Sequence, residues 1–199
     1  MAPAGCGAGP EGMNGLFAAA AEVCAFMAPR GWEFCIIGGL AVAQWGEPRT
    51  TLDADMTLLT GWGEEEPYVR ALLEAFEPRM PGAREFAISR RVLLIRASNG
   101  KDVDIALGAL PFEEEMVQRA VNIGFGPGVV LPCCMPEDLF VMKAFADRPR
   151  DWTDAEGIAV RQKGTLDKAY ILRHLAALSA LKDSPDILAR ARRLLEEHP

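Results

Sequence analysis

Histidine is scarce in this 199-residue chain, which contains only His174 and His198. So few imidazoles argue against a histidine-rich zinc site. The chain has five cysteines, an odd number, and two of them, Cys133 and Cys134, are adjacent. Their spacing matches neither a zinc ribbon nor the disulfide framework of a secreted domain. We therefore predict reduced thiols that serve as packing residues in a cytoplasmic protein.

Long apolar runs are also missing. The most apolar stretch, "LFAAAAEVCAFMA", is interrupted by Glu22 and is shorter than the roughly 20 apolar residues that a membrane span needs. The opening "MAPAGCGAGPEG" has neither a basic region nor an apolar core, so no signal peptide is expected. The sequence predicts a cytoplasmic protein that does not bind a membrane.

Basic residues are outnumbered, with 21 Lys and Arg against 28 Asp and Glu and a net charge of -7. This balance argues against a broad electrostatic grip on nucleic acid. A local basic patch stays open as an alternative, formed by Arg84, Arg90, Arg91 and Arg96, so nucleic acid stays open as an acceptor. The composition, 50% hydrophobic and 25% charged, is that of an ordinary globular protein.

Hydrophobic periodicity and turn residues predict alternating helices and strands. Gly46 is expected to end its helix in the left-handed conformation, and Ser184 to cap the last helix. The predicted elements are helices at 13–28, 40–45, 64–77, 112–122 and 184–198, strands at 32–39, 51–59, 90–97, 102–110 and 129–134, a turn at 124–128 and further helices after 134.

This order predicts an α+β fold with a small mixed sheet flanked by helices and a C-terminal helical region. Strands give way to helices near residue 132. We therefore predict a core at residues 1–131, which carries the glycine turn and the aspartates, and a C-terminal helical region at residues 132–199.

Two aspartates share one face of the strand at 51–59. Strand alternation places Leu52, Ala54, Met56 and Leu58 on one face and Asp53, Asp55 and Thr57 on the other. Both carboxylates therefore point the same way, and oxygen-only ligands suit Mg²⁺.

A third carboxylate from a neighbouring strand completes a two-metal site. We predict that Asp104 supplies it. Asp102 shares the face of Asp104, but it lies beside Asn99 and Gly100 and is interpreted as a turn residue.

Gly38 and Gly39 follow a predicted strand and open a predicted helix. Their backbone N–H groups then lie at a helix N-terminus, where phosphate binds favourably. Without the aspartates, an ordinary tight turn explains the pair equally well. Together with the carboxylates, the pair indicates phosphoryl or nucleotidyl transfer.

The stretch "GGLAVAQWGEPRTTLDADM" followed by "VDIAL" resembles the nucleotidyltransferase fold of the DNA polymerase beta superfamily. The later stretch "MPEDLFVMKAFADRPRDWTDAEGI" resembles the AbiEii-like nucleotidyltransferases, the toxins of type IV toxin-antitoxin systems. The resemblance covers residues 34–158. One departure is Gly39, where the family often has serine.

The resemblance implies a nucleotidyltransferase that moves a nucleotide from an NTP to a hydroxyl or phosphate acceptor. It implies that Asp53, Asp55 and Asp104 are catalytic and bind Mg²⁺, and that Lys143 contacts the nucleotide phosphates. The implied partners are the NTP, an RNA or small-molecule acceptor, and a cognate antitoxin protein. The alternatives are an antibiotic-type adenylyltransferase and a catalytically silent protein that binds a nucleotide or a partner.

Several of these residues have a second interpretation. Arg49 either binds the nucleotide phosphates or is an ordinary solvated charge. Lys143 is alternatively a snorkelling surface lysine. Asp151 and Asp154 are alternatively N-cap residues of the helix that follows, and Asp151 otherwise holds the surroundings of Lys143 in place.

Overall fold

A computed structural model describes residues 10–126 and 128–198 of the chain. These residues divide into two compact units. The first comprises residues 10–40 and 50–133, and the second comprises residues 41–49 and the chain from 134 onwards. Helix α2 (Gly38–Trp45) begins in the first unit and ends in the second. The second unit is therefore assembled from two separate stretches of sequence.

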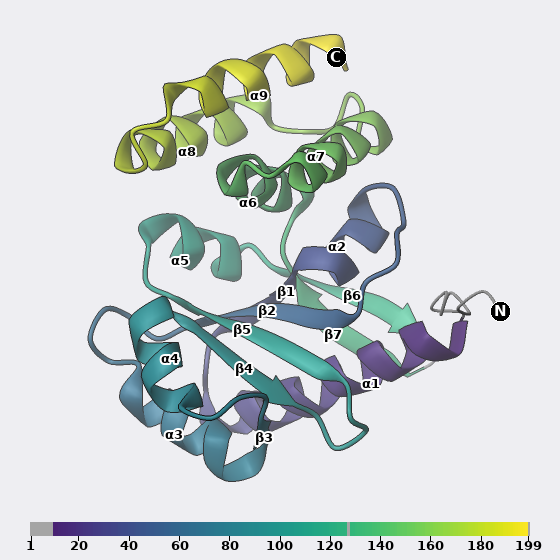
Figure 1. The fold of residues 1–199 in the computed structure, drawn as a ribbon. Helices are drawn as coiled ribbons and strands as arrows, with labels where there is room; N and C mark the ends of the chain where they lie inside the picture. The colour runs from purple at the N-terminus through teal and green to yellow at the C-terminus, as the bar shows by residue number, and fades with distance from the viewer. Residues whose placement is uncertain (1–9, 127, 199) are drawn as a thin grey trace, which may run out of the picture. The chain divides into compact units, whose positions relative to one another are not determined.

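The strands of the first unit form one mixed sheet (Figure 1), which is seven-stranded over the described residues. Its strand order is β3-β4-β5-β2-β1-β7-β6. The central pair, β2 and β5, is parallel, and the pairs on either side of it are antiparallel. The strands are β1 (Phe34–Ile37), β2 (Asp53–Leu59), β3 (Glu77–Pro78), β4 (Val92–Arg96), β5 (Asp102–Gly108), β6 (Val121–Gly126) and β7 (Val129–Cys133).

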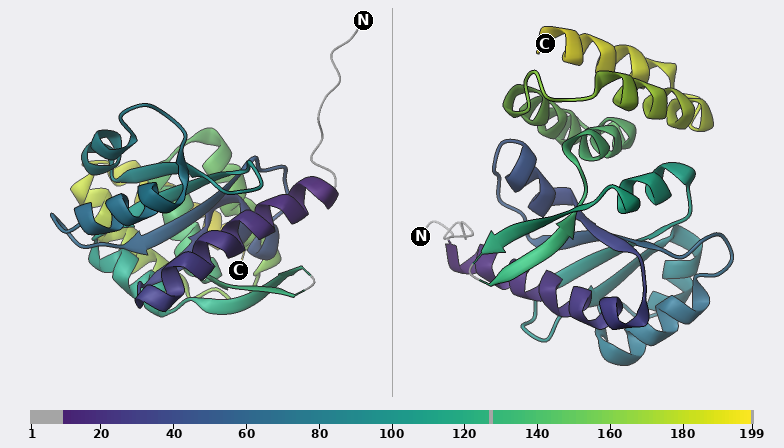
Figure 2. Two further views of the ribbon diagram at one scale, coloured as in Figure 1. Left: turned by 90° about the horizontal axis from the view of Figure 1, so that it is seen from below. Right: turned by 180° about the vertical axis from the view of Figure 1, so that it is seen from behind.

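Helices cover both faces of this sheet. The long helix α1 lies along one face and α5 lies on the other, as two views show (Figures 1 and 2). The helices of the first unit are α1 (Pro10–Met27), α3 (Glu66–Ala75), α4 (Ala83–Arg90) and α5 (Pro111–Gln118), with a short 3-10 turn at Ala28–Arg30.

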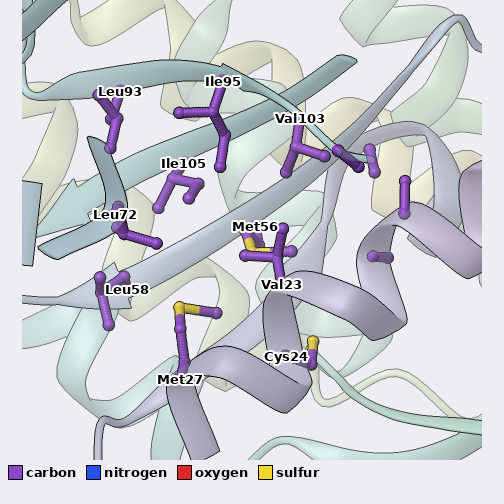
Figure 3. Packing of buried hydrophobic residues seen from close by; sticks show 14 of the residues in the cluster. Val23, Cys24, Met27, Met56, Leu58, Leu72, Leu93, Ile95, Val103 and Ile105 are labelled. Atoms are coloured by element: carbon purple, nitrogen blue, oxygen red, sulfur yellow. The ribbon is translucent and has the colours of Figure 1, made fainter. Parts of the chain in front are cut away.

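The core of the first unit lies between the sheet and α1. Alternate residues of β2, β4 and β5 point toward this helix, and Met56, Ile95 and Ile105 are fully buried beside Val23 and Met27 (Figure 3). Period-2 alternation leaves the intervening residues of these strands on the opposite face. The aspartates of β2 and β5 therefore lie on the face away from α1.

The second unit is helical beyond α2. Its helices are α6 (Pro136–Ala146), α7 (Pro149–Arg161), α8 (Lys168–Leu181) and α9 (Pro185–Glu197). Helix α6 is mostly buried, and Tyr170 Oη on α8 donates to Asp138 Oδ1 on α6 at 2.5 Å. A hydrogen bond joins the two stretches of this unit: Trp45 Nε1 donates to the carbonyl of Cys134 at 2.8 Å.

The α+β class is confirmed, but several local expectations are wrong. Helix α4 and the short strand β3 were not anticipated. The helix expected at 112–122 ends at Gln118, because Val121 begins strand β6, whose residues alternate in burial and pair with β7. The turn expected at 124–128 is partly β6, and its Pro127 lies outside the described residues.

Three single-residue expectations also fail. Gly46 follows α2 but does not have a positive φ, so it is not in the left-handed conformation. Its lack of a side chain matters for packing, because an added Cβ would lie 3.1 Å from Ile158 Cγ1. Leu52 precedes β2 and is 77% exposed, so it does not join the buried face. Ser184 stands at the N-cap of α9, but its hydroxyl donates to the carbonyl of Lys182 instead of capping the helix.

The described cysteines are all buried: Cys24, Cys35, Cys133 and Cys134. Burial raises the pKa of the Cys24 thiol to about 12, so this thiol stays protonated near neutral pH. Cys6 lies outside the described residues. Among the helices of residues 10–126 and 128–198, none has the length and apolarity required to cross a membrane.

Candidate functional site

An acidic group forms where β2 and β5 run side by side. Parallel pairing puts Asp53 opposite Asp102 and Asp55 opposite Asp104. All four belong to the strand face away from α1. Carboxylate oxygens of Asp53, Asp55 and Asp104 lie within 4.8 Å of one another. We refer to these three residues as the acidic group.

Asp102 is outside this group and is not the turn residue that the sequence suggested. It is the first residue of β5, and its carboxylate accepts from Arg96 Nε at 3.2 Å and pairs with Arg79 Nε at 3.3 Å. The antiparallel pairing of Arg96 with Asp102 explains the first contact, since facing residues of adjacent strands are close.

The two glycines allow Asp55 to approach the start of α2. Gly39 N–H donates to Asp55 Oδ2 at 3.2 Å. Gly38 has a φ of 60°, and a Cβ on it would lie 2.0 Å from the same oxygen. A side chain at position 38 is therefore opposed by both backbone conformation and space. In this structure a carboxylate of the chain itself takes the Gly39 donor that was predicted to bind phosphate.

Asp53 is held by Thr51, a residue that the sequence analysis missed. Thr51 is 5% exposed, and its Oγ1 donates to Asp53 Oδ1 at 3.1 Å. A Cβ on Gly39 would lie 2.4 Å from this hydroxyl. The available signal was a threonine two residues before an aspartate, because short hydroxyl side chains bond to nearby groups in this way.

Replacing Gly38 by alanine is expected to lower the free energy of unfolding by about 3 kcal/mol, because about 1–2 kcal/mol of left-handed strain adds to the clash with Asp55. Gly31 is the matched control: its φ is 68°, and nothing lies within 4 Å of an added Cβ. Gly31→Ala should cost only the strain. Urea unfolding of both variants measures the difference, and equal losses would contradict the close approach of Asp55.

Asp104 is partly buried and lies among charges of both signs. Burial raises the pKa of its carboxyl, and the negative charges of Asp53 and Asp102 act in the same direction. Arg79 opposes them through an ion pair between its Nη1 and Asp104 Oδ1. The net pKa of Asp104 is still raised. Arg79 is a second residue that the sequence did not suggest. It directly follows β3, the edge strand that is separated from β5 by β4.

The donor set of the acidic group fits Mg²⁺. This ion prefers oxygen ligands at about 2.0–2.1 Å, so two ligand atoms of one ion lie at most about 4.2 Å apart. A spread of up to 4.8 Å accommodates one ion after a small side-chain rotation, or two ions about 3.5–4 Å apart that share carboxylates.

Arg49 and Lys143 belong to the second unit, where they share a buried carboxylate. Arg49 donates to Asp154 through Nε at 2.7 Å and Nη2 at 3.0 Å. Lys143 Nζ lies 2.9 Å from Asp154 Oδ2 and 3.1 Å from Asp151 Oδ1. Arg148 also pairs with Asp151. We call these five residues the charge network.

The contacts of the charge network contradict two of the alternative interpretations. Lys143 is 8% exposed and ion-paired, so it is not a snorkelling surface lysine. Arg148 occupies the N-cap of α7, so neither Asp151 nor Asp154 caps that helix. Burial raises the pKa of Asp154, but its hydrogen bonds and charge contacts with Arg49 and Lys143 outweigh this, and the net pKa is lowered.

No protein-family model and no curated protein sequence match this chain. Similar solved structures do exist. An antigenic nucleotidyltransferase-like protein from Paracoccidioides brasiliensis is similar with a TM-score of 0.51 and 15% identity, over 94% of this chain and 89% of that chain. The antibiotic-resistance factor ANT(2'')-Ia is similar with a TM-score of 0.50 and 17% identity, over 92% of this chain and 96% of that chain. These likenesses identify the α+β architecture of this chain as a nucleotidyltransferase fold.

Proposed function

We propose that this protein is a magnesium-dependent nucleotidyltransferase. The observation that carries the proposal is the acidic group, three carboxylates gathered within 4.8 Å on adjacent strands of a nucleotidyltransferase fold. Burying like charges together is costly unless a cation compensates them. A site of this kind is therefore suited to hold Mg²⁺.

In the proposed reaction, an acceptor oxygen forms a bond to the α-phosphorus of an NTP. The bond to pyrophosphate breaks, pyrophosphate leaves, and the acceptor hydroxyl releases its proton to the solvent. Bound Mg²⁺ supplies Lewis-acid stabilisation of the phosphate charge. Thr51 and Gly39 orient Asp53 and Asp55, so these ligands need little reorganisation at the moment of reaction.

Two classes of acceptor follow from different observations. An RNA acceptor and a cognate antitoxin belong to the AbiEii-like form of the proposal, which depends on the sequence resemblance. A small-molecule acceptor is favoured by the structural similarity to the antibiotic-resistance factor ANT(2'')-Ia. A catalytically silent protein that only binds nucleotide or a partner is the alternative from another class.

Incubation with each labelled NTP and magnesium tests the proposal. Total RNA is the acceptor in one arm and a panel of antibiotics in the other. Label in RNA or in one small molecule identifies the acceptor class, and its loss on chelation establishes the metal requirement. Growth arrest on expression, abolished by Asp53→Asn, tests the toxin role. A protein that binds NTP without turnover in any arm is the silent alternative.

The two aspartates of β5 are expected to differ in function. Asp104→Ala should reduce nucleotidyl transfer by at least about a hundredfold, because it removes a metal ligand. Asp102→Ala should keep most of the activity, since Asp102 pairs with Arg96 and Arg79 and lies outside the acidic group. Initial rates at saturating magnesium measure both. The reverse order would refute the assignment.

The nucleotide-binding roles of Arg49 and Lys143 stay predictions. NTP affinity and transfer rate, measured in Lys143→Arg and Arg49→Lys, test them while each variant keeps its positive charge within the charge network. If either side chain contacts the phosphates in a way that depends on its geometry, its substitution should weaken NTP binding and slow transfer together.

A further inference from the structure

Arg79 reaches the acidic group from outside the strands that build it. Its backbone N–H donates to the carbonyl of Leu94 at 3.1 Å, which anchors it beside β4 directly after the short strand β3. Leu94 faces Asp104 in the pairing of β4 with β5. The Arg79 side chain therefore spans one strand to meet its carboxylate partners.

The Arg79 guanidinium bridges two carboxylates. Nη1 pairs with Asp104, and Nε lies 3.3 Å from Asp102 Oδ2. Both partners are partly buried, with 26% and 33% of their side chains exposed, so water screens these charges incompletely. A planar fork that binds two carboxylates at once also fixes their relative orientation.

Four carboxylates occupy this strand face, from Asp53, Asp55, Asp102 and Asp104. Like charges at such spacing repel one another. Arg79 supplies a positive charge within this acidic group, through the ion pair of its Nη1 with Asp104 Oδ1. Its guanidinium therefore compensates the charge of Asp104 at Oδ1, as a divalent cation bound to this predicted metal ligand would.

We propose that Arg79 is a built-in counter-ion of the acidic group, which holds Asp104 in the metal-free protein and sets the affinity for the divalent cation. The inference depends on the proposed function, because it takes the acidic group to be a metal site. Cation and guanidinium then compete for the charge of Asp104. Arg79 is a positioning residue, and metal binding weakens its hold on Asp104.

Removing Arg79 should have two opposite effects. Arg79→Gln should bind Mg²⁺ about tenfold more tightly, because a competing positive charge is lost. The same variant should be less stable than the wild type without metal, and magnesium should restore most of the difference. A residue that served the fold alone would lower stability and leave the metal affinity unchanged.

Arg96 provides the matched control. It also pairs with Asp102, at 3.2 Å, and with Glu77, at 3.4 Å, but Asp104 is not among these partners. Arg96→Gln therefore removes a neighbouring positive charge without touching the acidic group. We expect its magnesium affinity to stay within about twofold of wild type.

Calorimetric titration with magnesium alone, and thermal unfolding with and without it, measure these effects in the full chain. Arg79→Gln with equal or weaker magnesium affinity than wild type would overturn the inference. If Arg79→Gln folds only in magnesium, the cation replaces the guanidinium and the inference stands; failure to fold in either condition refutes it. Wild-type protein that binds no magnesium would instead refute the proposed function.

Discussion

Replacement of either strand aspartate by asparagine, in Asp53→Asn or Asp55→Asn, is expected to lower the rate of nucleotidyl transfer at least about a thousandfold. Each variant loses a negative charge from the acidic group, so the stabilisation of developing phosphate charge by bound metal is lost. Single-turnover transfer from labelled NTP measures the effect.

The fold should survive these substitutions. An asparagine oxygen can still accept from Thr51 at position 53 and from the Gly39 N–H at position 55, so the local hydrogen bonds are kept. Fewer like charges also reduce repulsion. Urea midpoints at or above the wild-type value are therefore the control, and near-normal activity in both variants would show that the site is misplaced.

Asp154→Asn is expected to reduce the free energy of unfolding by about 3 kcal/mol. Asp154 is 5% exposed and lies between Arg49 and Lys143, so its neutralisation removes the negative charge that both of these side chains contact. Arg148→Gln is the control within the same network, because the Arg148 side chain is 74% exposed and should contribute at most about 0.5 kcal/mol. Denaturant unfolding at neutral pH measures both.

The stability difference should also depend on pH. The pKa of Asp154 is lowered in the folded protein, so its ionisation stabilises the fold above the unfolded value, about 3.9 for aspartate, and this contribution is lost as the pH falls through the folded pKa. The wild type and Asp154→Asn should therefore converge in stability at acid pH. A gap that stays constant from neutral to acid pH would contradict the ionic role of Asp154.

The sequence by itself determined which residues share a face of each strand. Alternation along β2 and β5 separates Met56 and Ile105 from the aspartates, and this local rule requires no knowledge of the fold. The sequence also indicated that Gly38 is a special position, but the contact that the structure shows there is not the one predicted. The structure shows the close approach of Asp55 at this position, a contact between residues 17 apart in the sequence, and the phosphate contact stays a prediction.

Only the tertiary structure decided which strands are neighbours and at what register. The parallel alignment of Asp55 with Asp104 depends on long-range pairing, since equivalent hydrogen bonds form at other registers and local sequence does not distinguish them. The same limit hid Arg79, which directly follows a two-residue strand and pairs with Asp104 across β4. It also hid the pairing of Arg49 with Asp154, which lie 105 residues apart in the chain, because burial and not local propensity makes such ion pairs necessary.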